Sequence, residues 1–176
     1  MSVKPCVRCC LPFSIVLLAS LAQAGDVWLF LKDGRAGVGD PSREPVRIAF
    51  ADGIAATITK DFIQFQRTQE QVDQGVQAIF QELLRGENFE ANAKRFKVLQ
   101  AAAIPKVLEY LMHEDVKRRL VALYALQYCW SPQAQDPVLK ALEDKESDVR
   151  KGAVQVLIRQ VPAKKAADRL LPLADG

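Results

Sequence analysis

The sequence contains few of the side chains that enzymes use for catalysis. It has one histidine, His113, and four cysteines, of which only Cys129 lies beyond the first ten residues. One imidazole cannot build a histidine-based metal cluster, and no second imidazole is present to assist a nucleophile. We place His113 in a turn and Cys129 near the far end of the next helix, roughly 20 Å away, too far for a catalytic dyad. The sequence therefore predicts no enzymatic activity, no metal site and no cofactor.

The chain also lacks an apolar run long enough to cross a bilayer. Its longest run, from Leu11 to Leu21, covers about 11 residues, whereas a spanning helix needs roughly 20. Lys4 and Arg8 precede this run, and the small-residue triplet Ala22-Gln23-Ala24 follows it. This three-part layout is typical of a secretory signal. We expect cleavage after Ala24, a periplasmic or secreted protein, and no stable membrane insertion after cleavage.

Removal of residues 1–24 changes the composition. The remaining chain has 152 residues (176 − 24), with 22 basic residues (24 − 2) and 21 acidic ones. A charge so close to neutral gives no reason to expect nucleic acid or an anionic membrane as a partner. Cys6, Cys9 and Cys10 leave with the signal, so their CxxC spacing predicts no redox or metal site. Cys129 alone cannot form an internal disulfide.

Residues 25–67 have the pattern of a small β module. Apolar runs that end at Asp33-Gly34 and at Asp52-Gly53 are the strongest short-range signal for hairpins. The expected strands are Val27–Leu31, Val46–Phe50, Ile54–Thr59 and a possible fourth at Phe62–Phe65.

The segment from Arg35 to Pro45 is rich in turn formers, and we expect an exposed loop there. A sheet of three or four short strands is marginal alone, so it should pack on the first helix that follows. The module is interpreted as a cap on the end of a helical stack. The alternative is an SH3-like or hairpin module that recognises a ligand through Trp28 and the long loop.

Residues 68–176 are predicted to be helical. A helical stripe covers Gln69–Arg85 and stops at Gly86. A second helix is expected over Phe89–Ala103, ending before Pro105 because a proline ring disfavours the helical conformation in the residue before it, Ile104. These two helices could be a degenerate first repeat.

Two clearer helical hairpins follow, and they have a constant period. Leu108, Leu139 and Leu170 are 31 residues apart (139 − 108 = 170 − 139), and Leu111, Leu142 and Leu173 have the same spacing. A fixed period of about 30 residues indicates stacked units that bury their apolar faces against one another. The first unit has a leading helix at Lys106–Met112, a turn at 113–115 and a trailing helix at Val116–Tyr128. A last leading helix is expected at Ala163–Ala174.

Acidic residues precede both trailing helices. Asp115 comes before Val116 and Asp148 before Val149, where a carboxylate would cap the free backbone N–H groups. Gly152 lies inside the second trailing helix, which predicts close approach of a neighbouring helix. The acidic residues between the helices of the second unit lack the spacing of a calcium loop and are interpreted as a solvated turn; they are Glu143, Asp144, Glu146 and Asp148.

The segments VKRRLVALYAL and DVRKGAVQVL resemble the trailing helices of HEAT-like repeats, of the type found in phycobilisome-lyase-related proteins. The resemblance covers about residues 105–174 and implies a short α-α solenoid, so the whole fold should be mainly α with a small N-terminal β module. It also implies a hydrogen-bonded ladder between units, with Asp115 and Lys117 in one unit and Asp148 and Arg150 in the next. The family has Ala where this chain has Leu120 and Gly152.

These features favour an exported, non-enzymatic scaffold that binds an unknown protein partner. Solenoids commonly use their trailing helices to line the binding side, so the candidate contacts are Arg118, Arg119, Gln155 and Arg159. Their basic character would suit an acidic partner. The alternative is an accessory factor, similar to a lyase or chaperone, that handles a prosthetic group or a substrate protein.

Overall fold

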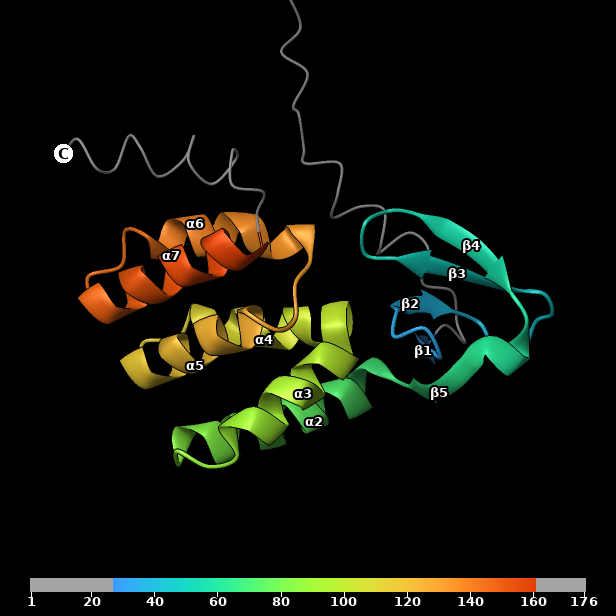
Figure 1. The fold of residues 1–176 in the computed structure, drawn as a ribbon, viewed down its shortest axis with the longest axis horizontal. Helices are drawn as coiled ribbons and strands as arrows, with labels where there is room; N and C mark the ends of the chain where they lie inside the picture. Colours follow the sequence, from blue (N-terminus) through green and yellow to red (C-terminus); the bar gives the residue numbers. More distant parts are fainter. Residues whose placement is uncertain (1–26, 161–176) are drawn as a thin grey trace, which may run out of the picture.

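The computed structural model describes residues 27–160 (Figure 1). The expected signal segment, the expected cleavage site and the expected helix at 163–174 lie outside the described residues. In Figure 1 a sheet forms one side of the molecule and a group of helices the other, with β5 leading directly into α2.

The N-terminal part is a five-stranded antiparallel sheet with the order β4-β3-β2-β1-β5. The first four strands form a meander, and β5 returns to pair with β1, with the short helix η1 (Lys60–Phe62) before it. The strands are β1 (Val27–Leu31), β2 (Ala36–Gly39), β3 (Val46–Phe50), β4 (Ala55–Ile58) and β5 (Ile63–Arg67). The four expected strands are present at about the expected positions, and their glycine turns at Gly34 and Gly53 have positive φ.

The expectation of an exposed loop over Arg35–Pro45 was wrong for Ala36–Gly39, which form β2, and is confirmed for residues 40–45. The glycines of β2 serve close packing and do not form turns. A Cβ at Gly37 would lie 2.6 Å from the carbonyl oxygen of Ala49, and one at Gly39 would overlap the carbonyl oxygen of Arg47. Only glycine allows β2 to lie this close to β3.

The two faces of β1 belong to two different cores. Trp28 and Phe30 pack with the helices, whereas Leu29 and Leu31 pack with β3 on the opposite face. Trp28 is buried, and its indole N–H donates a hydrogen bond of 2.6 Å to Oε1 of Gln69 at the start of α2. The sheet therefore packs on the first helix, as expected. The alternative in which Trp28 contacts a ligand is not supported, because its ring lies inside the core.

The rest of the described chain is helical. The first helix begins at a capping box, in which Thr68 Oγ1 accepts from Gln71 N and the Gln71 side chain accepts from Thr68 N. The α-helices are α2 (Gln69–Leu84), α3 (Phe89–Leu99), α4 (Ile104–Leu111), α5 (Val116–Leu126), α6 (Gln135–Ala141) and α7 (Ser147–Gln160), with short helices η2 (Gln100–Ala103) and η3 (Pro132–Ala134) before α4 and α6.

The second expected helix, Phe89–Ala103, is divided. Gln100 has a φ of 45°, which ends α3, and η2 continues directly into α4. Ile104 was expected to be non-helical but has φ −56° and ψ −48°. Pro105 lies in the first turn of α4, where its missing N–H costs nothing. Complete burial of the Ile104 side chain outweighs the local preference set by the proline.

Helix α5 lies among other helices. It contacts α2, α4 and α7, which agrees with the prediction of a helix that is apolar on most of its circumference. The leucines of the first two units, Leu108, Leu111, Leu139 and Leu142, all pack in the same core. No helix in the described part of the chain is long and apolar enough to cross a membrane.

Candidate partner-binding surface

The two helical hairpins share an arginine clamp at equivalent positions. Nη1 of Arg119, in the first turn of α5, donates to the carbonyl oxygens of His113 (3.0 Å) and Glu114 (2.7 Å). Nη1 of Arg150 makes the same two contacts with Asp144 (2.7 Å) and Lys145 (3.0 Å). Each arginine therefore closes the turn before its own helix, and the 31-residue period of the leucines applies to the arginines as well (150 − 119 = 31).

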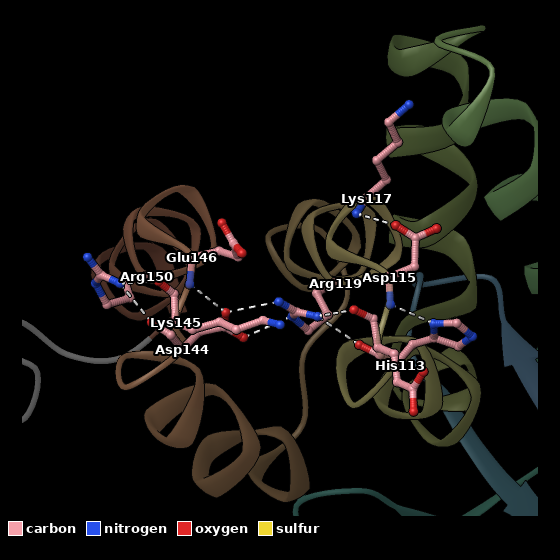
Figure 2. Close-up of polar contacts among 9 residues, drawn as sticks. His113, Asp115, Lys117, Arg119, Asp144, Lys145, Glu146 and Arg150 are labelled. Atoms are coloured by element: carbon pink, nitrogen blue, oxygen red, sulfur yellow. Dashed lines mark hydrogen bonds and ion pairs between the residues drawn. The ribbon is translucent and has the colours of Figure 1, made fainter.

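The first clamp extends to the next hairpin (Figure 2). Arg119 Nη2 donates to Oδ1 of Asp144 over 3.0 Å, and its Nε lies 2.8 Å from Oδ2. Both side chains are largely buried, with exposures of 8% and 15%. Burial raises the pKa of Asp144, but the Glu146 N–H and the Arg119 guanidinium outweigh it and hold the pKa below its ordinary value. This ion pair joins the two hairpins.

The predicted ladder was wrong in its residues. Asp115 caps α5 as expected, accepting from Lys117 N at 2.9 Å. Asp148 lies inside α7 and pairs instead with Lys151. The prediction aligned Val116 with Val149, a shift of 33 residues (149 − 116), whereas helix α7 starts two residues before Val149. A period of 31 residues aligns Arg119 with Arg150. Of these two, Arg119 forms the ion pair with Asp144 that joins the units.

The four expected contact residues do not share one surface. Arg119 is buried in the ion pair with Asp144, so it is not available to a partner. Arg118 Nη1 lies 2.9 Å from His113 Nε2, at the N-terminal end of α5. Gln155 and Arg159 are exposed on α7. Only Arg159 lies in the cluster described next.

An aromatic–cationic surface crosses the three trailing helices α3, α5 and α7. The ring of Phe89 meets Tyr124 edge to face at 5.6 Å, and Tyr124 lies 5.2 Å from Tyr128. The cations of Lys97 and Arg159 lie over the Tyr128 ring at 5.7 and 5.3 Å. Phe89 is 47% exposed, and both tyrosines are half-buried. We call these five residues the aromatic–cationic surface.

Sequence reasoning missed this surface because it treated Tyr124 and Tyr128 only as residues of the trailing helix at Val116–Tyr128. A tyrosine has an apolar ring and a polar tip, so it fits a half-buried site that a simple apolar count treats as core. Tyr124 donates a hydrogen bond of 2.8 Å to the carbonyl oxygen of Phe89. Burial, together with the neighbouring Tyr128, raises the pKa of Tyr124 to about 12. The phenol therefore remains a neutral donor at physiological pH.

His113 and Cys129 have separate environments. His113 lies in the exposed turn, where its Nδ1 accepts from the backbone N–H of Asp115 at 3.0 Å. Cys129 is buried, and burial raises the pKa of its thiol to about 12. Such a thiol is almost entirely protonated near neutral pH and is a poor nucleophile.

The acidic residues near the second turn are used within the fold. Asp144 pairs with Arg119, and Asp148 with Lys151, while Glu143 is exposed. Across residues 27–160, no three His, Cys, Asp or Glu side chains lie close enough together to hold a metal ion.

A groove of about 590 Å³ lies on another part of the molecule, between β5, α2 and α3. Apolar side chains and small residues form much of its lining, and basic groups stand among them. The lining residues used below are Phe65, Arg67, Gly75, Ile79, Lys94 and Val98.

Comparison with protein families finds a match for the helices from α4 onwards. Residues 104–176 match the family model of HEAT repeats. No curated protein and no solved structure matches the chain. The match begins at the first residue of α4 and includes both hairpins that carry the arginine clamp. Residues 104–176 of this chain are therefore similar to HEAT repeats, and the described part of this segment, up to Gln160, contains both hairpins.

Proposed function

We propose that this chain is an exported, non-enzymatic HEAT-repeat scaffold that binds a protein partner through the aromatic–cationic surface. HEAT repeats generally mediate protein–protein interaction. The observation that carries the proposal is that five residues from α3, α5, α7 and the turn after α5 form one cluster, in which Phe89, Lys97 and Arg159 are exposed and both tyrosines are half-buried. Tyrosine and arginine are enriched among the residues that contribute most to binding at interfaces.

The chemistry of the surface favours an acidic partner segment. Lys97 and Arg159 are exposed cations, and each lies over the half-buried ring of Tyr128. A carboxylate above this ring would meet two positive charges, while Phe89 offers apolar contact at 47% exposure. The successive hairpins form a short solenoid in this proposal, with the trailing helices as its binding side.

Site-specific photocrosslinking in the native cell tests this function. A photoreactive amino acid at Gln155, which is exposed on α7 beside Arg159, should capture one defined protein. The crosslink should be lost with Tyr128→Ala or Arg159→Glu and retained with Lys140→Glu, a matched exposed cation on α6. A product that is unchanged in all three variants would exclude this surface as the binding site.

Export is tested separately. The N-terminal sequence of the protein isolated from the periplasm or the medium should begin at Gly25, as the Ala22-Gln23-Ala24 triplet predicts. Recovery of the full-length chain in the cytoplasm would contradict export. It would not affect the proposal that the aromatic–cationic surface binds a partner.

A further inference from the structure

Strand β5 ends the sheet on one side. It pairs with β1, and no other described strand lies on its outer edge. An edge strand presents backbone N–H and C=O groups that can pair with another extended chain. Its residues Ile63 and Phe65 are half-buried, whereas Gln64, Gln66 and Arg67 are exposed. The exposed side chains show that β5 has solvent on at least one face, beside its unpaired edge.

The groove described above lies beside this edge. Phe65 and Arg67 of β5 form one wall, and Ile79 of α2 and Val98 of α3 contribute apolar surface. Val98 is 51% exposed, although it lies beside these apolar groups. The groove is therefore an apolar site that the described part of the chain leaves unfilled.

Gly75 is a second observation that points to a ligand in this groove. It lies in the interior of α2, where glycine is less favourable than any residue except proline. A Cβ at Gly75 would meet no atom within 4 Å, whereas one at Gly152 would lie 3.0 Å from Leu123 Cδ1. Packing explains Gly152 but not Gly75. A glycine at this position lets a ligand approach the backbone of α2 closely.

The charged residues of the groove lining favour a ligand with a negative charge. Its lining contains Arg67, Lys94 and Arg95 but only one carboxylate, Glu82. Arg95 pairs with Glu82 at 2.9 Å, and Lys94 pairs with Glu90 at 3.0 Å. The Arg67 guanidinium lies 5.6 Å from the centroid of the Phe65 ring, next to the strand edge. The surplus of positive charge favours a ligand with a carboxylate near Arg67.

We propose that the outer edge of β5 and the adjoining groove bind an extended segment of a partner protein. The segment pairs with β5 as an additional strand, places an apolar side chain between Ile79 and Val98 near Gly75, and directs an acidic side chain to Arg67. Backbone hydrogen bonds supply affinity in this mode of recognition, and side-chain pockets supply specificity. This surface is separate from the aromatic–cationic surface and does not depend on it.

Selection from a displayed library of random octapeptides tests the proposal on the full mature chain. The selected peptides should alternate apolar and polar residues and contain Asp or Glu. For one selected peptide, Gly75→Leu and Arg67→Glu should each weaken binding at least tenfold. Methylation of alternate backbone nitrogens of the peptide should also weaken binding at least tenfold, because it removes the N–H donors that a strand needs.

Two variants serve as matched controls. Gln77→Leu places the same leucine side chain on α2 outside the groove lining, and Arg85→Glu reverses an exposed charge at the end of the same helix. Both should leave binding within twofold of the natural chain. Arg67 is exposed, so Arg67→Glu tests the site even where Gly75→Leu disturbs folding. Failure to enrich any peptide, selection of basic peptides, or binding that is indifferent to N-methylation or to Arg67→Glu would overturn the proposal.

Discussion

The hairpin α4–α5 and the hairpin α6–α7 use the same arginine in different surroundings. Arg119 and Arg150 each close their own turn through two carbonyl oxygens. Arg119 also binds Asp144 of the next hairpin and is buried, whereas Arg150 is exposed. One sequence position therefore has two structural roles. In the first hairpin the arginine joins two units, and in the second its contacts within residues 27–160 are those that stabilise its own turn.

The comparison predicts a large difference between the two arginines. Arg119→Ala should lower the free energy of unfolding by about 3–5 kcal/mol, because it leaves the Asp144 carboxylate buried without its counter-ion. Arg150→Ala should cost less than about 1 kcal/mol, since its side chain is exposed and water can replace its contacts. Urea unfolding followed by circular dichroism measures both values.

A double replacement separates the effect of an unpaired buried charge from the effect of lost side-chain packing. Arg119→Met combined with Asp144→Leu removes both buried charges together and should recover most of the stability that Arg119→Ala loses. Equal losses for Arg119→Ala and Arg150→Ala would show that the ion pair with Asp144 does not join the hairpins.

The acidic partner of Arg119 predicts a dependence on pH. The pKa of Asp144 is lower in the folded protein than its ordinary value of 3.8. Its contribution to stability is therefore present above 3.8 and is lost as the pH falls through the folded-state pKa. Asp144→Asn removes this contribution, so the stability difference between the natural chain and the variant should narrow on acidification. Denaturant midpoints of both proteins, taken from neutral pH to below the ordinary pKa of Asp144, measure this stability difference. A difference that stays constant with pH would contradict the assignment of the effect to Asp144.

Local sequence patterns predicted most elements of the fold. The Asp-Gly turns, the helical stripe from Gln69 and the leucine period are short-range signals, and each corresponds to an observed turn, helix or repeat. The segment at Arg35–Pro45 was different, because Gly37 and Gly39 could serve either a turn or close strand packing. The two possibilities differ only in whether β3 lies against these glycines, and the sequence around Gly37 and Gly39 does not show the position of β3.

The candidate site was harder to predict than the fold. The ladder residues depended on whether the period was 31 or 33, and aligning the valines favoured the wrong choice. Arg119 was expected to contact a partner, because it lies on a trailing helix and such helices commonly line the binding side of a solenoid. Its burial follows from the position of Asp144 in the next hairpin. The aromatic–cationic surface likewise requires three helices to be placed together before Tyr124 and Tyr128 can be recognised as its centre.

Helix capping offers a second contrast between the hairpins. Asp115→Ala should cost about 1 kcal/mol, because Asp115 accepts a hydrogen bond from a free N–H group at the start of α5. Asp148→Ala should cost only a few tenths of a kcal/mol, on the order expected for a carboxylate in a first helical turn. Thermal unfolding of the two variants under the same buffer conditions compares them. A larger loss for Asp148→Ala would restore the alignment of Val116 with Val149.

The last contrast is between two glycines inside helices, Gly75 in α2 and Gly152 at the contact between the hairpins. Gly75→Ala should stabilise the protein by about 1 kcal/mol, because alanine favours the helix and its methyl group meets no atom there. Gly152→Ala should give a smaller gain or a loss, since its methyl group would lie 3.0 Å from Cδ1 of the buried Leu123. In a Leu123→Ala background this obstacle is absent, so Gly152→Ala should stabilise about as much as Gly75→Ala does. The difference between the two backgrounds measures the contact between position 152 and Leu123, and its absence would show that Leu123 does not restrict the side chain at position 152.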